Sequence, residues 1–382
     1  MINDRHRVLS KKGGLMAKSK AVVFENANEP LPVKEFDIPE LKEGCVLVKT
    51  VLSGVCGTDP HCWRGHVKGM PVPVILGHES VGRIDKIASD RKTDSVGEPV
   101  KEGDTIFWVA GHPCGQCHAC VIEKDTTGCI ARRSYGWSYS CADYPHLTGG
   151  YSEYVFLTSK SFFFKIPDSV PAEAAIAFGC GFPTAVRGFD VMSGVQPGES
   201  VVIQGAGPVG LSCLVLAKLG GASPIVVMGA PPSRLELAKR LGADITVDIS
   251  ELGDSESRIL ATKDAIGEAN LVIEATGFPE AVGEGLELVK TFGRYLVMGV
   301  FSDLGPVPIN PSLIVRKNMQ LFGSVFWEPK HLHRVIQLLS AHNESLSLQD
   351  AVTHRYGLAE STSALEDVEA LKCVKAVIDP TL

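Results

Sequence analysis

Four cysteines lie within sixteen positions of the chain, in the stretch HPCGQCHACVIEKDTTGC. They are Cys114, Cys117, Cys120 and Cys129. Closely spaced thiols can form disulfides, hold an iron–sulfur cluster or bind zinc. The chain has eleven cysteines and no convincing secretory signal, so we expect a reducing compartment. In such a compartment, clustered cysteines are more often metal ligands than disulfides.

Three further residues of metal-binding types stand far apart in the sequence. Cys56 lies in GVCGTDPH, His78 in GHE and Cys180 in GCGFPTA. Two thiolates and an imidazole that leave one position open form the kind of site in which zinc is catalytic. Spacing alone does not bring these residues together. Each taken singly also fits a buried core histidine or a small apolar cysteine.

The segment VVIQGAGPVG carries the spacing G-x-G-x-x-G, with Gly205, Gly207 and Gly210. It follows an apolar strand-like run and opens an apolar helix-like run, the context in which this motif binds a dinucleotide. The glycines allow a tight turn, a close approach of the backbone to pyrophosphate, and close packing of helix on strand. A glycine-rich turn in an α/β domain that binds no nucleotide is the alternative.

The acidic residue that often follows this motif is missing. An Asp or Glu about 20 residues further on would bind the adenosine ribose of NAD. Here the strand-like run PIVVM ends at Gly229, and the nearest basic residue is Arg234. No carboxylate would repel the 2′-phosphate of NADP, and no basic residue follows directly to bind it. The choice between NAD and NADP stays open.

Two regions with different patterns must position these residues. Residues 17–160 contain short Val- and Ile-rich runs broken by Gly and Pro, which indicates an irregular, mostly antiparallel β domain. From about 186 the chain alternates strand-like and helix-like runs, with six apolar strands in all. This alternation predicts an open, parallel, doubly wound sheet. Afterwards we expect one strong helix over 329–341 and a final strand over 374–379.

Composition excludes several classes of protein. The 382 residues are 45% hydrophobic and 21% charged, as in a folded globular protein of two domains. The net charge of −7 argues against a nucleic-acid or membrane-surface partner, and no run reaches the roughly 18 apolar residues of a membrane span. We expect a cytoplasmic protein whose residues 1–15 form a flexible extension.

The motifs together resemble the zinc-dependent alcohol dehydrogenase family of the medium-chain dehydrogenase/reductase superfamily. GVCGTD, GHE, the cysteine cluster, GGYSEYV, GCGFPTA, the glycine motif and VKAVI occur in the family's order. The resemblance implies an α/β protein. A GroES-like, β-rich catalytic domain would span 1–181, a Rossmann doubly wound domain 182–325, and 326–382 would return to the catalytic domain.

The resemblance also implies two zinc ions per chain. Cys56, His78 and Cys180 would hold the catalytic zinc, with Glu79 behind the metal and Asp59 orienting His78. The four clustered cysteines would form a closed structural zinc site. An iron–sulfur cluster is disfavoured there, because the fourth cysteine lacks the short spacing and following proline of the bacterial cluster motif.

Further roles follow from the same resemblance. The implied reaction is reversible hydride transfer between an alcohol and NAD or NADP, with the proton leaving through Thr58 and then His61. Thr184 and Val209 would contact the nicotinamide, and Lys375 the pyrophosphate. Gly57 departs from the family, since it stands where some members carry a basic residue aimed at that pyrophosphate.

The predicted function is therefore that of an NAD(P)-dependent zinc alcohol dehydrogenase acting on a small-molecule alcohol, aldehyde or ketone. A polyol-type or other zinc dehydrogenase is the alternative. A non-enzymatic nucleotide-binding scaffold would be expected to lack the zinc ligands, which are present. Aromatic residues in 132–154 could line the substrate pocket or form interface core. We also expect a homodimer or homotetramer that pairs through an edge strand and loop within 297–315.

Overall fold

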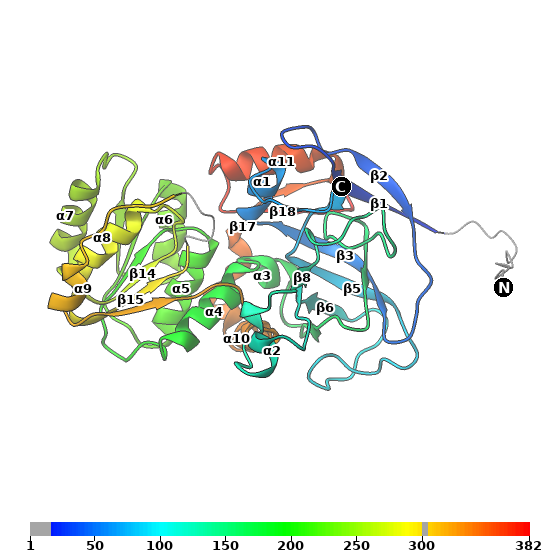
Figure 1. Ribbon diagram of the computed structural model, residues 1–382, viewed down its shortest axis with the longest axis horizontal. Helices are drawn as coiled ribbons and strands as arrows, with labels where there is room; N and C mark the ends of the chain where they lie inside the picture. The colour runs from blue at the N-terminus through cyan, green and yellow to red at the C-terminus, as the bar shows by residue number, and fades with distance from the viewer. Residues whose placement is uncertain (1–16, 300–304) are drawn as a thin grey trace, which may run out of the picture.

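The computed structural model describes residues 17–299 and 305–382, so the extension expected at 1–15 lies outside the described residues. Two sheet-based domains lie side by side (Figure 1). The β-rich domain is built on a seven-stranded sheet with the order β10-β6-β5-β3-β18-β17, in which β9 also pairs with β3. These strands are β3 (Val46–Val55), β5 (Ser80–Ile87), β6 (Thr105–Trp108), β9 (Tyr154–Leu157), β10 (Phe163–Lys165), β17 (Val352–Tyr356) and β18 (Lys375–Ile378).

Smaller elements complete this domain. A three-stranded sheet contains β1 (Lys18–Phe24), β2 (Val33–Asp37) and β4 (Val74–Ile75), and a two-stranded one contains β7 (Gly111–His112) and β8 (Arg133–Ser134). The short helices are α1 (Thr58–Trp63), α2 (His118–Val121), α3 (Ala172–Ile176), η1 (Thr126–Gly128), η2 (Leu348–Ala351) and η3 (Leu358–Glu360). The mostly antiparallel pairing confirms the prediction for residues 17–160.

The second domain contains a six-stranded sheet in which every pair is parallel, with the order β13-β12-β11-β14-β15-β16. The strands are β11 (Val201–Gln204), β12 (Ile225–Gly229), β13 (Ile245–Asp248), β14 (Ala269–Glu274), β15 (Val289–Val297) and β16 (Gln320–Gly323). The neighbouring strands β11 and β12 are buried throughout and, apart from Gln204, carry no polar side chain, because helices cover both faces of the sheet. The predicted doubly wound sheet is confirmed.

Helices alternate with these strands along the chain. They are α5 (Pro208–Leu219), α6 (Pro232–Arg240), α7 (Ser255–Ile266), α8 (Glu280–Leu288) and α9 (Ser312–Arg316). The strand order reverses between β11 and β14. A crevice outside the carboxyl ends of the strands at such a reversal is where dinucleotides bind in this architecture.

Two longer helices lie where the domains meet, α4 (Gly181–Val191) and α10 (Pro329–Leu346) (Figure 1). One hydrophobic core runs through this junction and includes Phe107 of β6, Ile203 of β11 and Leu332 of α10. The continuous core holds the two sheets in a fixed relation. The expected domain boundaries at 181/182 and 325/326 stay predictions.

The C-terminal stretch contains more structure than its sequence pattern predicted. The expected helix is present as α10 and the expected last strand as β18. The stretch also contains β17 and α11 (Ser361–Glu369). β17 lies at the edge of its sheet, where its side chains are exposed or half-buried, so it lacks the apolar pattern of a central strand.

The edge of the parallel sheet differs from the expectation for 297–315. The edge strand is β16, while the described part of 297–315 contains the end of β15 and α9, and residues 300–304 lie outside the described residues. No described helix is long and apolar enough to cross a membrane.

Candidate active site

The three donors predicted to hold a catalytic metal come together in the structure. One ligand atom from each of Cys56, His78, Glu79 and Cys180 lies within 4.8 Å of the others. The sulfur atoms of Cys56 and Cys180 are 3.6 Å apart, although 124 residues separate them in the sequence. Two sulfurs and an imidazole at this separation fit a tetrahedral zinc ion that retains one open position.

Three elements deliver these donors. Cys56 directly follows β3, and His78 lies two residues before β5, which pairs with β3. Cys180 is the N-cap residue of α4, the helix at the domain junction. The sheet therefore places the first two donors on the β-rich domain, and the helix brings the third to them.

Asp59 lies beside His78, as the sequence predicted. Its carboxylate oxygen Oδ1 is 3.3 Å from His78 Nδ1, without the alignment of a full hydrogen bond. The other oxygen accepts hydrogen bonds from the Cys56 backbone N–H at 2.8 Å and from the Tyr151 hydroxyl at 3.1 Å. Because Nδ1 faces this buried carboxylate, Nε2 is the ring nitrogen left for a metal.

Glu79 is buried behind the donors and forms an ion pair with Lys375, whose ammonium also donates to the Val55 carbonyl at 3.2 Å. A side chain at Gly54 or Gly179 would overlap the Glu79 carboxylate, which explains the glycines in both cysteine motifs. Gly179 also has a φ of +48°, a conformation that favours glycine. In the structure Lys375 therefore braces Glu79, and its contact with a pyrophosphate stays a prediction.

These neighbours control the charges of the donors. A hydrogen bond from Cys180 lowers the pKa of Cys56 to about 6, against the opposing effect of burial. Burial alone would lower the pKa of His78, but Asp59 and Cys56 together raise it well above its ordinary value. For the acid Glu79 the effect of burial is the opposite and would raise the pKa, but Lys375 and His78 hold this pKa at about 2. The hydrogen bond with Cys56 and burial raise the pKa of Cys180 well above its ordinary value, so a metal ion that binds here would displace protons from Cys180 and His78.

The two residues predicted to carry a proton lie on α1, next to the donors. The Thr58 hydroxyl oxygen is 3.7 Å from the Cys56 sulfur. His61 lies one helical turn further along, partly exposed, with its Nδ1 3.2 Å from Nδ1 of His66. Cys56, Thr58 and His61 are all half-buried, and the relay itself stays a prediction.

The glycine motif forms the expected turn between β11 and α5. A side chain at Gly210 would overlap the Gly205 carbonyl, so helix and strand approach closely, as predicted for the third glycine. Gly207 is the N-cap residue of α5, and a side chain there would meet open space. The first backbone N–H groups of α5 thus face a region that a phosphate can enter.

The donor cluster and the glycine turn adjoin each other. A side-chain carbon at Gly181, the residue after Cys180, would come within 3.0 Å of the Val209 backbone nitrogen. The start of α4 therefore packs against the start of α5. Thr184 lies on the first turn of α4, with its hydroxyl donating to the Cys180 carbonyl at 2.7 Å. The predicted contacts of Thr184 and Val209 with the nicotinamide are compatible with this placement.

Gly229 and Arg234 lie at the other side of the predicted nucleotide site. Gly229 ends β12 and packs tightly on Ala206, which leaves no room for a side chain. Arg234 lies on α6 and donates through Nη2 to the Cys373 carbonyl at 3.0 Å, which links the two domains. Its guanidinium is thus already engaged, and its role toward the cofactor stays a prediction.

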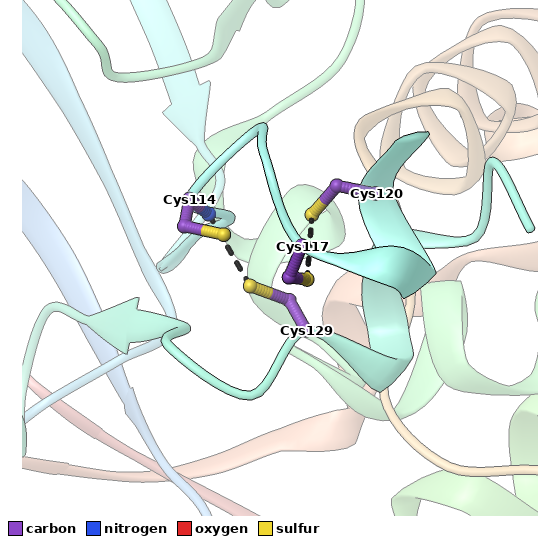
Figure 2. A group of neighbouring side chains, drawn as sticks. All are labelled: Cys114, Cys117, Cys120 and Cys129. Carbon is purple, nitrogen blue, oxygen red and sulfur yellow. Dashed lines mark hydrogen bonds between the residues drawn. The ribbon is translucent and has the colours of Figure 1, made fainter. Parts of the chain in front are cut away.

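The four clustered cysteines form a second donor group, with ligand sulfurs within 4.8 Å of one another (Figure 2). All four are free thiols, so the disulfide alternative is absent from the structure. The Cys114 N–H donates to the Cys129 sulfur at 3.2 Å, and the backbone N–H of Cys120 lowers the pKa of Cys117 to about 6. Four sulfurs that receive N–H groups fit a closed tetrahedral zinc site.

The loop that carries these cysteines, residues 112–129, is anchored to the domain junction. Asp125 forms an ion pair with Arg187 of α4 at 2.8 Å. The backbone N–H and hydroxyl of Thr126 both donate to Glu328, the N-cap residue of α10, at 3.0 and 3.1 Å. The loop therefore contacts both helices that lie between the sheets.

Trp137 is a neighbour of the metal site that the sequence did not single out. Its ring stacks on the imidazole of His78, with centroids 4.8 Å apart and planes at 28°. A side chain at the preceding Gly136 would clash with Gly77 and His78, so this loop is pressed onto the GHE motif. The only sequence signal was the aromatic content of 132–154, which did not distinguish this residue.

Comparisons with known proteins agree with this arrangement. Residues 42–168 match the family model described as the alcohol dehydrogenase GroES-like domain, and residues 208–341 match the zinc-binding dehydrogenase model. The 5-exo-hydroxycamphor dehydrogenase of Pseudomonas putida is 36% identical over 371 residues, which cover 96% of this chain and 99% of that protein.

Solved structures show the same fold. An alcohol dehydrogenase from Thermotoga maritima has a TM-score of 0.88 and 36% identity over 95% of this chain and 99% of its own. A zinc-binding dehydrogenase from Sinorhizobium meliloti bound to NADP has a TM-score of 0.82 and 27% identity over 95% of this chain and all of its own. The two family models and these full-length similarities show that the chain belongs to the zinc-dependent alcohol dehydrogenase family of the medium-chain dehydrogenase/reductase superfamily.

Proposed function

We propose that this NAD(P)-dependent zinc dehydrogenase acts on an apolar, cyclic secondary alcohol, with Cys56, His78 and Cys180 as the ligands of its catalytic zinc. The family acts on CH–OH groups, and zinc and NAD(P) are its cofactors. The observation that carries the ligand assignment is the convergence of the three donors within 4.8 Å, beside the glycine turn.

Zinc held there would supply Lewis acidity, which makes an alcohol a better hydride donor by lowering its pKa. The residues of the chain provide the rest. Asp59 orients His78, and the Glu79–Lys375 pair supports the donors from behind. Thr58 takes the alcohol proton and His61 passes it toward solvent. Thr184 and Val209 would limit the position of the nicotinamide, a role supported by the close packing of the start of α4 on the start of α5.

Two observations support the apolar substrate class. Trp137 covers one face of His78 and offers a flat hydrocarbon wall beside the donors. The relative from Pseudomonas putida, 36% identical, is named for a bicyclic terpene alcohol. A polyol-type substrate is the alternative. A polyol would need several hydrogen-bonding groups near the metal, and a cysteine third ligand with an indole wall does not favour it.

The proposal also includes features that membership of the family does not decide. Cys114, Cys117, Cys120 and Cys129 would hold the structural zinc. Gly229 leaves no carboxylate to repel a 2′-phosphate, so NADP can be accepted as well as NAD. A cytoplasmic location and a homodimer or homotetramer remain predictions.

The test is a kinetic screen with metal analysis. Purified protein is assayed with bicyclic and monocyclic secondary alcohols, benzyl alcohol, ethanol and sorbitol, each with NAD and with NADP. We expect the largest kcat/KM for a cyclic secondary alcohol, at least about tenfold above sorbitol, because a buried apolar ring contributes roughly 1.5–3 kcal/mol. About two zinc ions per chain are expected from two complete sites. Equal or better turnover of sorbitol would favour the polyol alternative, and absence of zinc would refute both metal sites.

A further inference from the structure

Glu274 is a buried carboxylate at the place where the nucleotide crevice is expected. It is the last residue of β14 and is fully inaccessible to solvent. Its backbone pairs with Gln204, the last residue of β11, on one side and with Val297 of β15 on the other. Glu274 therefore lies at the strand ends next to the reversal of strand order between β11 and β14.

The carboxylate holds two loops at once. Oε1 accepts hydrogen bonds from the Thr276 N–H and hydroxyl, both at 2.7 Å, and from the Gly277 N–H at 2.9 Å. Oε2 accepts one from the Gly299 N–H, also at 2.9 Å. Among the described residues no Lys, Arg or His forms an ion pair with Glu274. The charge is balanced by donors of the loops that follow β14 and β15.

These loops are packed against the glycine turn. A side-chain carbon at Gly205 would come within 2.9 Å of the Ala275 carbonyl oxygen. One at Gly299 would come within 2.6 Å of the Thr276 nitrogen. The backbone segments after β11, β14 and β15 therefore form one contiguous surface. Glu274 accepts hydrogen bonds from both the segment after β14 and the segment after β15.

The position of Glu274 indicates which half of the cofactor this surface contacts. A doubly wound sheet binds a dinucleotide across its switch point, with one mononucleotide on each half. The adenosine half belongs to the side of β12, where the ribose-binding acid would stand. The β14 and β15 side is thus left for the nicotinamide half, next to α4, where a side chain at Gly188 would overlap Met298.

We propose that Glu274 is a positioning residue for the nicotinamide half of NAD(P). It acts through the backbone of residues 275–277 and Gly299, which it holds in place as a surface against which the nicotinamide ring can pack. A carboxylate with four donors holds such loops rigidly, and a rigid site binds its ligand without an ordering cost. The inference rests on NAD(P) use by the family and does not depend on the proposed substrate.

The experiment compares two ligands that differ only by the ring. Dissociation constants are measured for the reduced cofactor that the wild type prefers and for ADP-ribose, or its 2′-phosphate if that cofactor is NADPH. Glu274→Gln keeps the size of the side chain but sets an NH₂ group against the Gly299 N–H, which releases one loop. We expect the dissociation constant of the reduced cofactor to rise about tenfold, and that of ADP-ribose to change less than twofold.

Two further variants complete the design. Glu284→Gln alters another buried carboxylate of the same domain, which is paired with Arg258 on α7, and should leave the ratio of the two constants unchanged. Thr276→Val removes one donor and keeps the side-chain shape, so a smaller, two- to threefold selective loss is expected; it serves as the test if Glu274→Gln does not fold. Equal weakening of both ligands, or no weakening of either, would overturn the proposal. Because no alcohol is present in the assay, the result stands apart from the question of substrate.

Discussion

The two donor clusters of this protein, each proposed to hold zinc, are built in opposite ways. The four-cysteine site takes its ligands from one loop of sixteen residues, whose apolar side chains Val121 and Ile122 are 51% and 65% exposed. The site of Cys56, His78 and Cys180 draws on distant parts of the sequence and lies within the domain junction, with Asp59 and Glu79 buried behind it.

From this difference we infer what a metal ion would do at each cluster. The loop has little core of its own, so a metal ion there replaces the missing hydrophobic contacts. The second cluster is already held by the seven-stranded sheet, α4 and a buried ion pair. A metal ion there contributes chemistry more than folding. Removing the two metals should therefore have different consequences.

The largest effect is expected at the buried site. His78→Ala removes one zinc ligand and should lower kcat by roughly 10³-fold or more, because Lewis acidity supplies several kcal/mol to the barrier. Zinc content should fall by about one ion per chain. Fluorescence titration should show cofactor binding within about threefold of the wild type, since the glycine turn is intact. Residual kcat above a tenth of the wild-type value would contradict the assignment.

The next effect concerns the loop site. Cys114→Ser should release the structural zinc and lower the thermal midpoint by roughly 5–10 °C, because the loop loses its main stabilising contact. Differential scanning calorimetry with zinc analysis measures both quantities. Cys141→Ser, a change to a thiol outside both clusters, should keep two zinc ions per chain. A fully stable Cys114→Ser variant that retains both metals would refute the structural role.

Mild acid should destabilise the start of α10, where Glu328 anchors the four-cysteine loop. Burial lowers the pKa of His331 to about 4, and its Nδ1 accepts the Glu328 N–H at 2.8 Å at the start of α10. The unfolded chain binds a proton near pH 6.5 and the folded chain does not, so stability is complete above pH 6.5 and is lost as pH falls toward 4. His331→Asn should show a smaller decrease of the thermal midpoint between pH 7 and pH 5. An equal decrease in both proteins would exclude this histidine as a cause.

The smallest effect tests the cofactor side of the buried site. A side chain at Gly57 would meet no atom within 4 Å, so Gly57→Arg can be accommodated. If its guanidinium reaches the pyrophosphate, cofactor dissociation should slow about two- to fivefold, as expected for a partly exposed ion pair. Stopped-flow displacement of the reduced cofactor measures the rate, and Gly57→Gln serves as the uncharged control. Unchanged or faster dissociation would show that Gly57 does not face the cofactor.

The loop site and the glycine turn were predictable because their residues are close in sequence. Cys114 to Cys129 and Gly205 to Gly210 each form one local unit whose spacing reflects its geometry. The approach of Cys56 to Cys180 could be expected only from resemblance, since nothing local brings them together. Tertiary packing places the ring of Trp137 over His78 and aligns the four hydrogen bonds that Glu274 accepts. No rule of residue spacing encodes either contact.

The buried pair of Glu79 and Lys375 has a consequence for selectivity. Their opposite charges cancel, and two thiolates would match the charge of a divalent ion, so the Asp59 carboxylate beside His78 is the one charge left among the described residues of this pocket. A neutral alcohol or ketone can shed its water there without electrostatic opposition. A substrate that carries a carboxylate would find no unpaired cation among these buried groups, so organic acids should be poorly accepted.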